Sequence, residues 1–159
     1  MTASDPSRAA NGQDPIDEVI AKFVEQTVAR PLVNNTLRGF LVESIIALEL
    51  KADWSWCGGD YGSWDFANDD GVRLEIKQSA ARQSWKLGTD SKKSQPRFDI
   101  RTRQRAEDNG CSGRAAHIYV FAYHPVDDQT ADHRDPRQWE FYCVPASKLP
   151  PQKSIGLRA

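Results

Sequence analysis

The sequence lacks the features that mark several common classes of protein. Its 159 residues include only three cysteines, without a CxxC spacing, which argues against a disulfide framework and against a zinc site built on thiolates. It also lacks a Walker A loop, a GxGxxG turn, a GxSxG elbow and histidine pairs such as HxH or HExxH. The usual signatures of nucleotide-binding proteins, serine hydrolases and zinc proteases are therefore absent.

Long apolar runs are missing as well. The longest, at residues 41–50, is interrupted by two glutamates and a serine, so it falls short of the roughly 18 consecutive apolar residues of a membrane span. Residues 1–14 contain no apolar segment, and we expect them to form a disordered N-terminal tail rather than a secretion signal. These observations predict a cytoplasmic protein with no membrane partner.

An excess of one charge is also absent, because the formal net charge is -1, whereas many nucleic-acid-binding proteins are strongly basic. This near-neutrality results from cancellation. Residues 1–72 contain five Lys or Arg against twelve Asp or Glu, and residues 73–159 contain sixteen against ten. Because the first half is acidic and the second half is basic, the near-neutral total does not exclude a nucleic-acid partner.

With 39% apolar and 27% charged residues, the composition is that of one globular domain, which we expect at residues 15–159. Helical spacing predicts one helix from Pro15, capped by Asp14, to about Arg30, and a second from about Thr36 to Lys51. In the second helix we expect a buried stripe that consists of Leu37, Phe40, Leu41, Ile45 and Leu48. Ile46 and Leu50 broaden it.

Patterns typical of strands fill the rest of the chain. Asp70-Gly71 is a strong turn signal, so we expect the strands on its two sides to form a β-hairpin. Helices followed by a hairpin and further strands indicate an α/β fold in which helices flank a mixed β-sheet. The strands are expected at SWDFA (63–67), VRLEIKQ (72–78), RFDIR (97–101), HIYVFAY (117–123) and QWEFYCV (138–144).

The hairpin gathers residues suited to bind a metal. Glu75 and Lys77 are two residues apart on a strand, so their side chains share one face. Asp65, on the other arm, would lie beside Glu75, and Asp60 is the fallback in the same turn-rich segment. Two carboxylates held together repel unless a divalent cation takes up the charge. Glu43, on the polar margin of the second helix, adds a third oxygen donor.

The sequence also contains a control for the Glu-x-Lys spacing. Glu49-Leu50-Lys51 repeats it at the end of the predicted helix, where residues two apart do not face each other. Of the two copies, only the one on the strand can therefore belong to a site. The plain structural explanation of Glu75 and Lys77 is a solvated strand face, and that of Glu43 is a structural ion pair.

An acid-bearing helix, a Gly-rich turn, WDF and LEIKQS together resemble the PD-(D/E)XK nuclease superfamily, over roughly residues 38–123, with Trp64 in the place of the motif's proline. The resemblance implies a restriction-endonuclease-like core in the order αβββαβ. It also implies a Mg²⁺- or Mn²⁺-dependent endonuclease that hydrolyses DNA phosphodiester bonds with a metal-activated water.

The resemblance further implies the role of each site residue. Asp65, Glu75 and the carbonyl of Ile76 would bind the metal, and Glu43 would act as a metal or water ligand. Lys77 would position or help deprotonate the attacking water and stabilise charge on the phosphate.

The segment after the motif favours a phosphate-rich partner, namely duplex or branched DNA. Residues 82–105 contain eight Lys or Arg against two Asp, a balance of +6, interleaved with Trp85 and Phe98. A solvated charged loop is the other explanation. The candidate nucleic-acid-binding residues, including two that precede the segment, are Arg38, Gln78, Arg82, Lys86, Lys92, Lys93, Arg101, Arg103 and Arg105.

Two other functions stay open from the sequence. The same scaffold could be a catalytically inactive nucleic-acid-binding or regulatory module, or a purely structural or protein-binding domain. Convergence of Asp65 and Glu75 with Lys77 beside them would favour the nuclease over the inactive module. A homodimer is open too, because double-strand cleavage favours two active sites.

Overall fold

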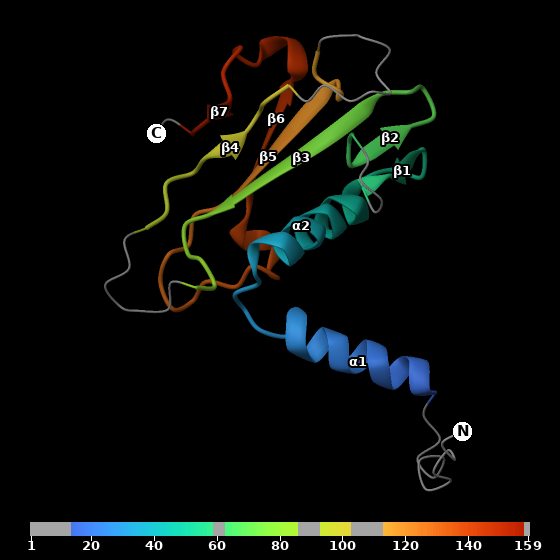
Figure 1. Ribbon diagram of the computed structural model, residues 1–159, viewed down its shortest axis with the longest axis vertical. Coiled ribbons are helices and arrows are strands. Elements are labelled where there is room, and N and C mark those ends of the chain that lie inside the picture. Colours follow the sequence, from blue (N-terminus) through green and yellow to red (C-terminus); the bar gives the residue numbers. More distant parts are fainter. Residues whose placement is uncertain (1–13, 59–62, 86–92, 103–112, 158–159) are drawn as a thin grey trace, which may run out of the picture.

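The computed structural model describes residues 14–58, 63–85, 93–102 and 113–157. These residues form a mixed α/β fold with two α-helices and a five-stranded mixed sheet in the order β1-β2-β3-β5-β6 (Figure 1). The helices are α1 (Pro15–Thr27) and α2 (Asn35–Glu49). The strands of the sheet are β1 (Trp54–Trp56), β2 (Phe66–Asn68), β3 (Arg73–Ala80), β5 (Ile118–His124) and β6 (Glu140–Pro145).

The first three strands form an antiparallel meander, and β5 then pairs in parallel with β3. The predicted hairpin across Asp70-Gly71 is confirmed as the β2–β3 connection, in which Gly71 has a φ of 76°. Such a positive φ is readily adopted only by glycine. The predicted strand at 97–101 is shortened to β4 (Phe98–Asp99) and lies outside the main sheet, paired with β7 (Ser154–Ile155). Among the described residues between β3 and β5 there is no helix.

Two layers cover the sheet. Because side chains alternate along a strand, Leu74, Ile76, Val120 and Ala122 face α2 and pack against its Val42. The other face of β5 packs against a second cluster that includes Phe98 and Ile100. The strand is therefore covered on both faces, as its nearly continuous apolar sequence predicts.

Both helices differ in part from their predicted form. α1 ends at Thr27, three residues before the predicted end, and hydrogen bonds from Arg134 to the Ala29 carbonyl and from the His133 N–H to the Pro31 carbonyl hold the segment that follows. In α2 the predicted buried stripe is wrong at Phe40 and Leu48, which are 43% and 86% exposed, whereas Val42 is fully buried. α2 has two apolar faces, and it packs on the sheet with the one that contains Val42.

Some predictions fall outside the described residues. Of the predicted tail at 1–14, only Asp14 is described. Asp14 caps α1 as predicted, because its side chain accepts a hydrogen bond from the Ile16 N–H. Cys57 and Cys143 are free thiols, and Cys111 lies outside the described residues. No helix within the described ranges is long and apolar enough to cross a membrane.

A buried polar network fixes the start of α2 against the segment after β5. His133 is fully buried, and its Nδ1 accepts a hydrogen bond from the Val33 N–H while its Nε2 lies 3.2 Å from the Arg82 carbonyl. Since a carbonyl only accepts, Nε2 carries the proton and the ring is neutral. Burial, followed by the positive charge of Arg38, lowers the pKa of His133 to about 4.

We expect this histidine to make the fold sensitive to acid. Between its ordinary pKa of 6.5 and the folded value of about 4, the unfolded chain binds the proton first, so the contribution of His133 to the free energy of unfolding should decrease as the pH falls through this window. Urea unfolding of the wild type and of His133→Gln at pH 7, 5.5 and 4.5 isolates this contribution as the difference in stability between the two proteins. The stability of the wild type relative to the variant should fall with the pH, and a difference that does not change with pH would contradict the assignment.

Candidate active site

The hairpin holds Asp65 against the middle of β3. Its backbone N–H donates to the Leu74 carbonyl at 2.9 Å, and its Oδ2 accepts from the Ile76 N–H at 2.5 Å. The N–H and C=O of one strand residue point to the same side, so the Ile76 carbonyl points toward the same edge as the Ile76 N–H. The predicted position of Asp65 beside the Glu75 segment is therefore what the structure shows.

Glu43 reaches the same place from α2. Its Oε2 accepts a hydrogen bond from the Trp56 indole Nε1 at 2.7 Å. A Cβ built on Gly58 would lie 2.9 Å from Glu43 Oε2 and 3.4 Å from Asp65 Oδ1. Oxygens of two carboxylates from distant parts of the chain therefore converge on one point, and the absence of a side chain on Gly58 leaves that point open.

Gly58→Ala should disturb this convergence, because its methyl group would displace the Glu43 carboxylate. If the site is catalytic, we expect activity to fall about tenfold or more, as small displacements of reacting groups do. Gly39→Ala is the matched control, since a Cβ there meets nothing within 4 Å and alanine favours the helix. Cleavage assays and thermal melts of both variants test this, and equal activity of the two would contradict it.

Glu75 and Lys77 share the face of β3 that points away from α2. The Lys77 ammonium donates to Glu75 Oε1, and the two side chains are only 23% and 17% exposed. They lie in a cavity of about 30 Å³, which is room for about one water molecule. The cavity is lined by Ser63, Glu75, Lys77, Asp99, Arg101, Ala115 and Tyr119.

The carboxylates are close enough to change one another's pKa. Burial, together with the negative charges of Glu75 and Glu43, raises the pKa of Asp65 to about 7, although the Ile76 hydrogen bond and the positive charge of Lys77 act in the opposite direction. Burial also raises the pKa of Glu43, and the charge of Glu75 adds to this against the Trp56 hydrogen bond. The site is thus short of positive charge, the condition that a bound cation relieves.

The donor chemistry fits a hard divalent cation, because carboxylate and carbonyl oxygens are the ligands that Mg²⁺ and Mn²⁺ prefer. However, within the described ranges no group of three or more His, Cys, Asp or Glu side chains is arranged to hold a metal. Each carboxylate is instead engaged by its own donor: an indole for Glu43, a backbone amide for Asp65 and Lys77 for Glu75. Lys77 engages only Oε1 of Glu75, and a carboxylate has a second oxygen that can accept from another partner.

Arg38 of α2 is buried and Gln78 of β3 is half-buried, and the two meet between α2 and the sheet. The Arg38 guanidinium is 1% exposed and donates to amide oxygens of Asn35, Gln78 and Gln83 at 2.7–2.9 Å. Gln78 also donates to Asn35. Both residues therefore connect α2 to β3 and its continuation. The burial of Arg38 does not present its guanidinium to a phosphate, whereas the nucleic-acid contact expected of Gln78 stays a prediction.

The remaining basic candidates are partly described. Arg82 donates to Gln129 Oε1 and to the Asp128 carbonyl, Lys93 lies 3.7 Å from Asp127, and Arg101 pairs with Asp99. Of these, Arg101 lines the Lys77 cavity. The candidates that lie outside the described residues are Asp60, Lys86, Lys92, Arg103 and Arg105.

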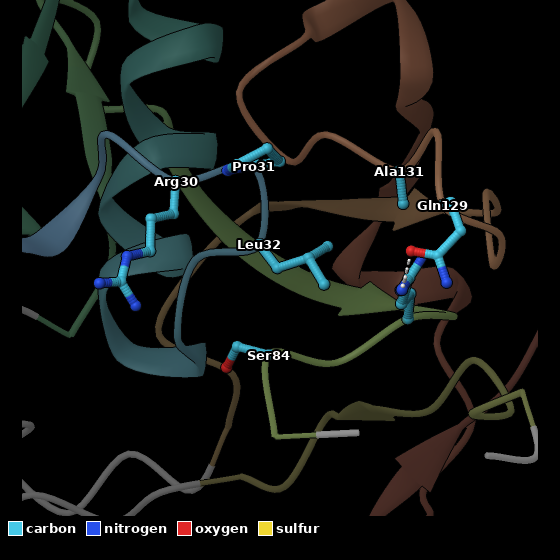
Figure 2. Close-up of a pocket in the computed structure, with 7 residues that line it drawn as sticks. Arg30, Pro31, Leu32, Ser84, Gln129 and Ala131 are labelled. Carbon is cyan, nitrogen blue, oxygen red and sulfur yellow. Dashed lines mark hydrogen bonds between the residues drawn. The ribbon is translucent and has the colours of Figure 1, made fainter. Parts of the chain in front are cut away.

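A larger cavity, of about 400 Å³, lies elsewhere (Figure 2). It shares no lining residue with the Lys77 cavity, and in Figure 2 Leu32 projects into the space between Arg30 and Gln129. Arg82 and Ser84 complete its polar lining. Arg82 and Gln129 are hydrogen-bonded to each other, and Leu32 lies between Arg30 and this pair, so the cavity specifies no class of ligand and we assign it none.

Sequence reasoning missed four residues at the candidate active site: Trp56, Gly58, Asp99 and Tyr119. For Asp99 a signal existed, because Asp99 and Arg101 alternate along the chain as Glu75 and Lys77 do. Nothing in the sequence pairs Trp56 with Glu43 or distinguishes Gly58 from its neighbouring glycines.

Comparison of the chain with protein-family models, with curated proteins and with solved structures found no match. Any function assigned to the site therefore depends on the side-chain arrangement described above.

Proposed function

We propose that this protein is a divalent-metal-dependent DNA nuclease of the PD-(D/E)XK type. The observation that carries the proposal is the convergence of Glu43 and Asp65 on Gly58, next to the Glu75–Lys77 pair. A solvated strand face does not explain it, because these carboxylates are partly buried and mutually repulsive, an arrangement that costs stability. Such arrangements are concentrated at functional sites.

The chain topology supports the proposal in part. The order α2-β1-β2-β3, followed by β5 parallel to β3, agrees with an αβββαβ core at each of these elements. The second helix of that core belongs between β3 and β5, where the described residues contain β4 and no helix. The restriction-endonuclease-like core therefore stays part of the proposal.

The proposed roles follow from position. Asp65, Glu75 and the Ile76 carbonyl, with Glu43, are the oxygen donors that would hold Mg²⁺ or Mn²⁺. A cation bound there would activate water and neutralise charge on the phosphate. Lys77 holds an ammonium beside Glu75, where it can donate to a water or a phosphate oxygen.

Nearby cations give DNA a path to this site. Arg101 lines the same cavity as Lys77, and its side chain is 63% exposed, so it can meet a phosphate at the rim. Trp85, which follows β3 in the chain, is also 63% exposed. Its indole ring offers a flat surface on which a base can stack. We propose that the backbone of DNA runs along this basic segment.

The purified full chain tests the proposal. We expect it to nick or cut DNA in the presence of Mg²⁺ or Mn²⁺ and not in EDTA, and a panel of plasmid, linear duplex, branched and single-stranded DNA and RNA would identify the substrate form. No cleavage of any of these, together with no heat of Mn²⁺ binding in calorimetry, would contradict it.

One observation favours a second candidate, the catalytically inactive nucleic-acid-binding module. The Lys77–Glu75 ion pair neutralises the site internally, and the described residues hold no three-ligand cluster. This candidate predicts DNA binding that is insensitive to EDTA, no cleavage and no heat of metal binding.

A further inference from the structure

α1 exposes an apolar face that the described part of the chain leaves unburied. Figure 1 shows the helix projecting away from α2 and the sheet, and none of its residues is buried. The spacing of its five exposed apolar residues places them on one stripe. They are Ile16 (65% exposed), Val19 (70%), Ile20 (55%), Phe23 (59%) and Val24 (43%).

A helix of 13 residues is marginal in water on its own. Most helices of this length gain their stability by packing an apolar face against another element, and exposed apolar patches of this kind mark interaction sites. We therefore expect another apolar surface to pack against this face of α1.

The outer side of α2 presents a matching face. Phe40 and Leu48 are 43% and 86% exposed and lie about two turns apart. Leu37, Leu41 and Ser44 fall on the same side of the helix, roughly opposite the buried Val42. α2, with 15 residues, is thus long enough to receive the 13 residues of α1 along its outer face.

The α1 of the same chain is held away from this face. The segment between the helices is fixed by the His133 N–H, which donates to the Pro31 carbonyl at 2.8 Å, and by the Val33 N–H, which donates to His133 Nδ1 at 3.1 Å. The Arg134 guanidinium also donates to the Ala29 carbonyl. Docking α1 on its own α2 would require release of these contacts, whereas docking on another copy requires none.

We infer that the protein forms a homodimer in which α1 of each copy packs on the outer face of α2 of the other. The contact is reciprocal, as twofold symmetry demands. It buries the five apolar residues of α1 with Phe40 and Leu48 in each copy, a set of large side chains on the scale of the roughly 800 Å² per partner of a stable interface.

The charges of α1 disfavour a membrane or a nucleic acid as the occupant. Its charged residues are Asp17, Glu18 and Glu25 against Lys22. Helices that lie on membranes are rich in Lys and Arg on this side, and a net negative helix repels DNA phosphates. The dimer does not depend on the proposed nuclease activity.

Sedimentation velocity of the full chain at micromolar concentrations tests the inference, with Phe23→Glu and Leu48→Glu as the two disrupting variants. Each should weaken the dimer on the order of 30-fold or more, the effect of losing a hot-spot side chain. Glu25→Lys, on the opposite side of α1, is the control and should dimerise normally. Mixing the two disrupting variants should restore a dimer, because one intact α1–α2 contact survives in the mixed pair.

Circular dichroism should show that both variants keep the wild-type fold, since both side chains are exposed. Hydrogen exchange of the wild-type chain adds a measurement without substitution: α1 should exchange more slowly as concentration rises. A monomeric wild type, a dimer that survives Leu48→Glu, or variants that do not rescue each other would overturn the inference.

Discussion

Lys77→Ala should abolish metal-dependent DNA cleavage while leaving the protein folded. The side chain lies on the face of β3 away from α2, pairs only with Glu75 among the described residues, and belongs to neither hydrophobic cluster. Its loss removes the one ammonium beside the carboxylates, and we expect the cleavage rate to fall about 100-fold or more, as when a single charge-stabilising donor is removed. Cleavage of a plasmid under saturating Mg²⁺ or Mn²⁺ measures it.

The sequence provides the control for this prediction. Lys51→Ala removes a lysine from the same Glu-x-Lys spacing just after α2, where its side chain is exposed and does not line the Lys77 cavity. We expect wild-type cleavage from this variant. Arg101→Ala should weaken DNA binding more than the rate at saturating DNA, because Arg101 lies at the rim. Wild-type cleavage by Lys77→Ala would eliminate the assigned role of Lys77.

The parts of the site that the sequence predicts are those decided locally. Asp70-Gly71 determines the turn, the period of two places Glu75 and Lys77 on one face, and together these put Asp65 beside β3. Each step depends on residues that are close in the chain, so a single sequence contains the information. The mixed α/β fold follows from the same local patterns.

The parts that could not be predicted depend on contacts between distant segments. α2 has two apolar faces, and only the packed sheet selects the one with Val42. Arg38 is of a residue type that is almost never fully buried unless paired, and the amides that satisfy it include Gln78 and Gln83, forty or more residues away. Asp99 and Arg101 reach Lys77 only because β4 is held by β7, close to the end of the described chain.

Asp65→Asn should have opposite effects on activity and on stability. Asparagine keeps an acceptor for the Ile76 N–H but removes the charge, so we expect cleavage to be lost. The folded pKa of Asp65 is about 7, above its ordinary value of 3.8, so the folded state binds the proton more tightly. The contribution of Asp65 to the free energy of unfolding therefore falls as the pH rises from about 4 to 7, opposite in sign to the contribution of His133.

Above pH 7 the wild type carries the whole cost of ionising Asp65, which is on the order of a few kcal/mol. The Asp65→Asn variant does not, so without metal it should unfold at a higher denaturant concentration than the wild type at pH 8 and at nearly the same concentration at pH 4.5. Mn²⁺ should stabilise the wild type at pH 8 and leave the variant almost unchanged.

Urea unfolding at both pH values, with and without Mn²⁺, measures these differences. A variant less stable than the wild type at pH 8 would mean that Asp65 has a structural role, since the interactions of its carboxylate would then stabilise the fold by more than its burial destabilises it. A variant that is more stable and inactive would show that the protein retains a destabilising charge at the point where Glu43 and Asp65 converge, and a retained charge of that kind is explained by function.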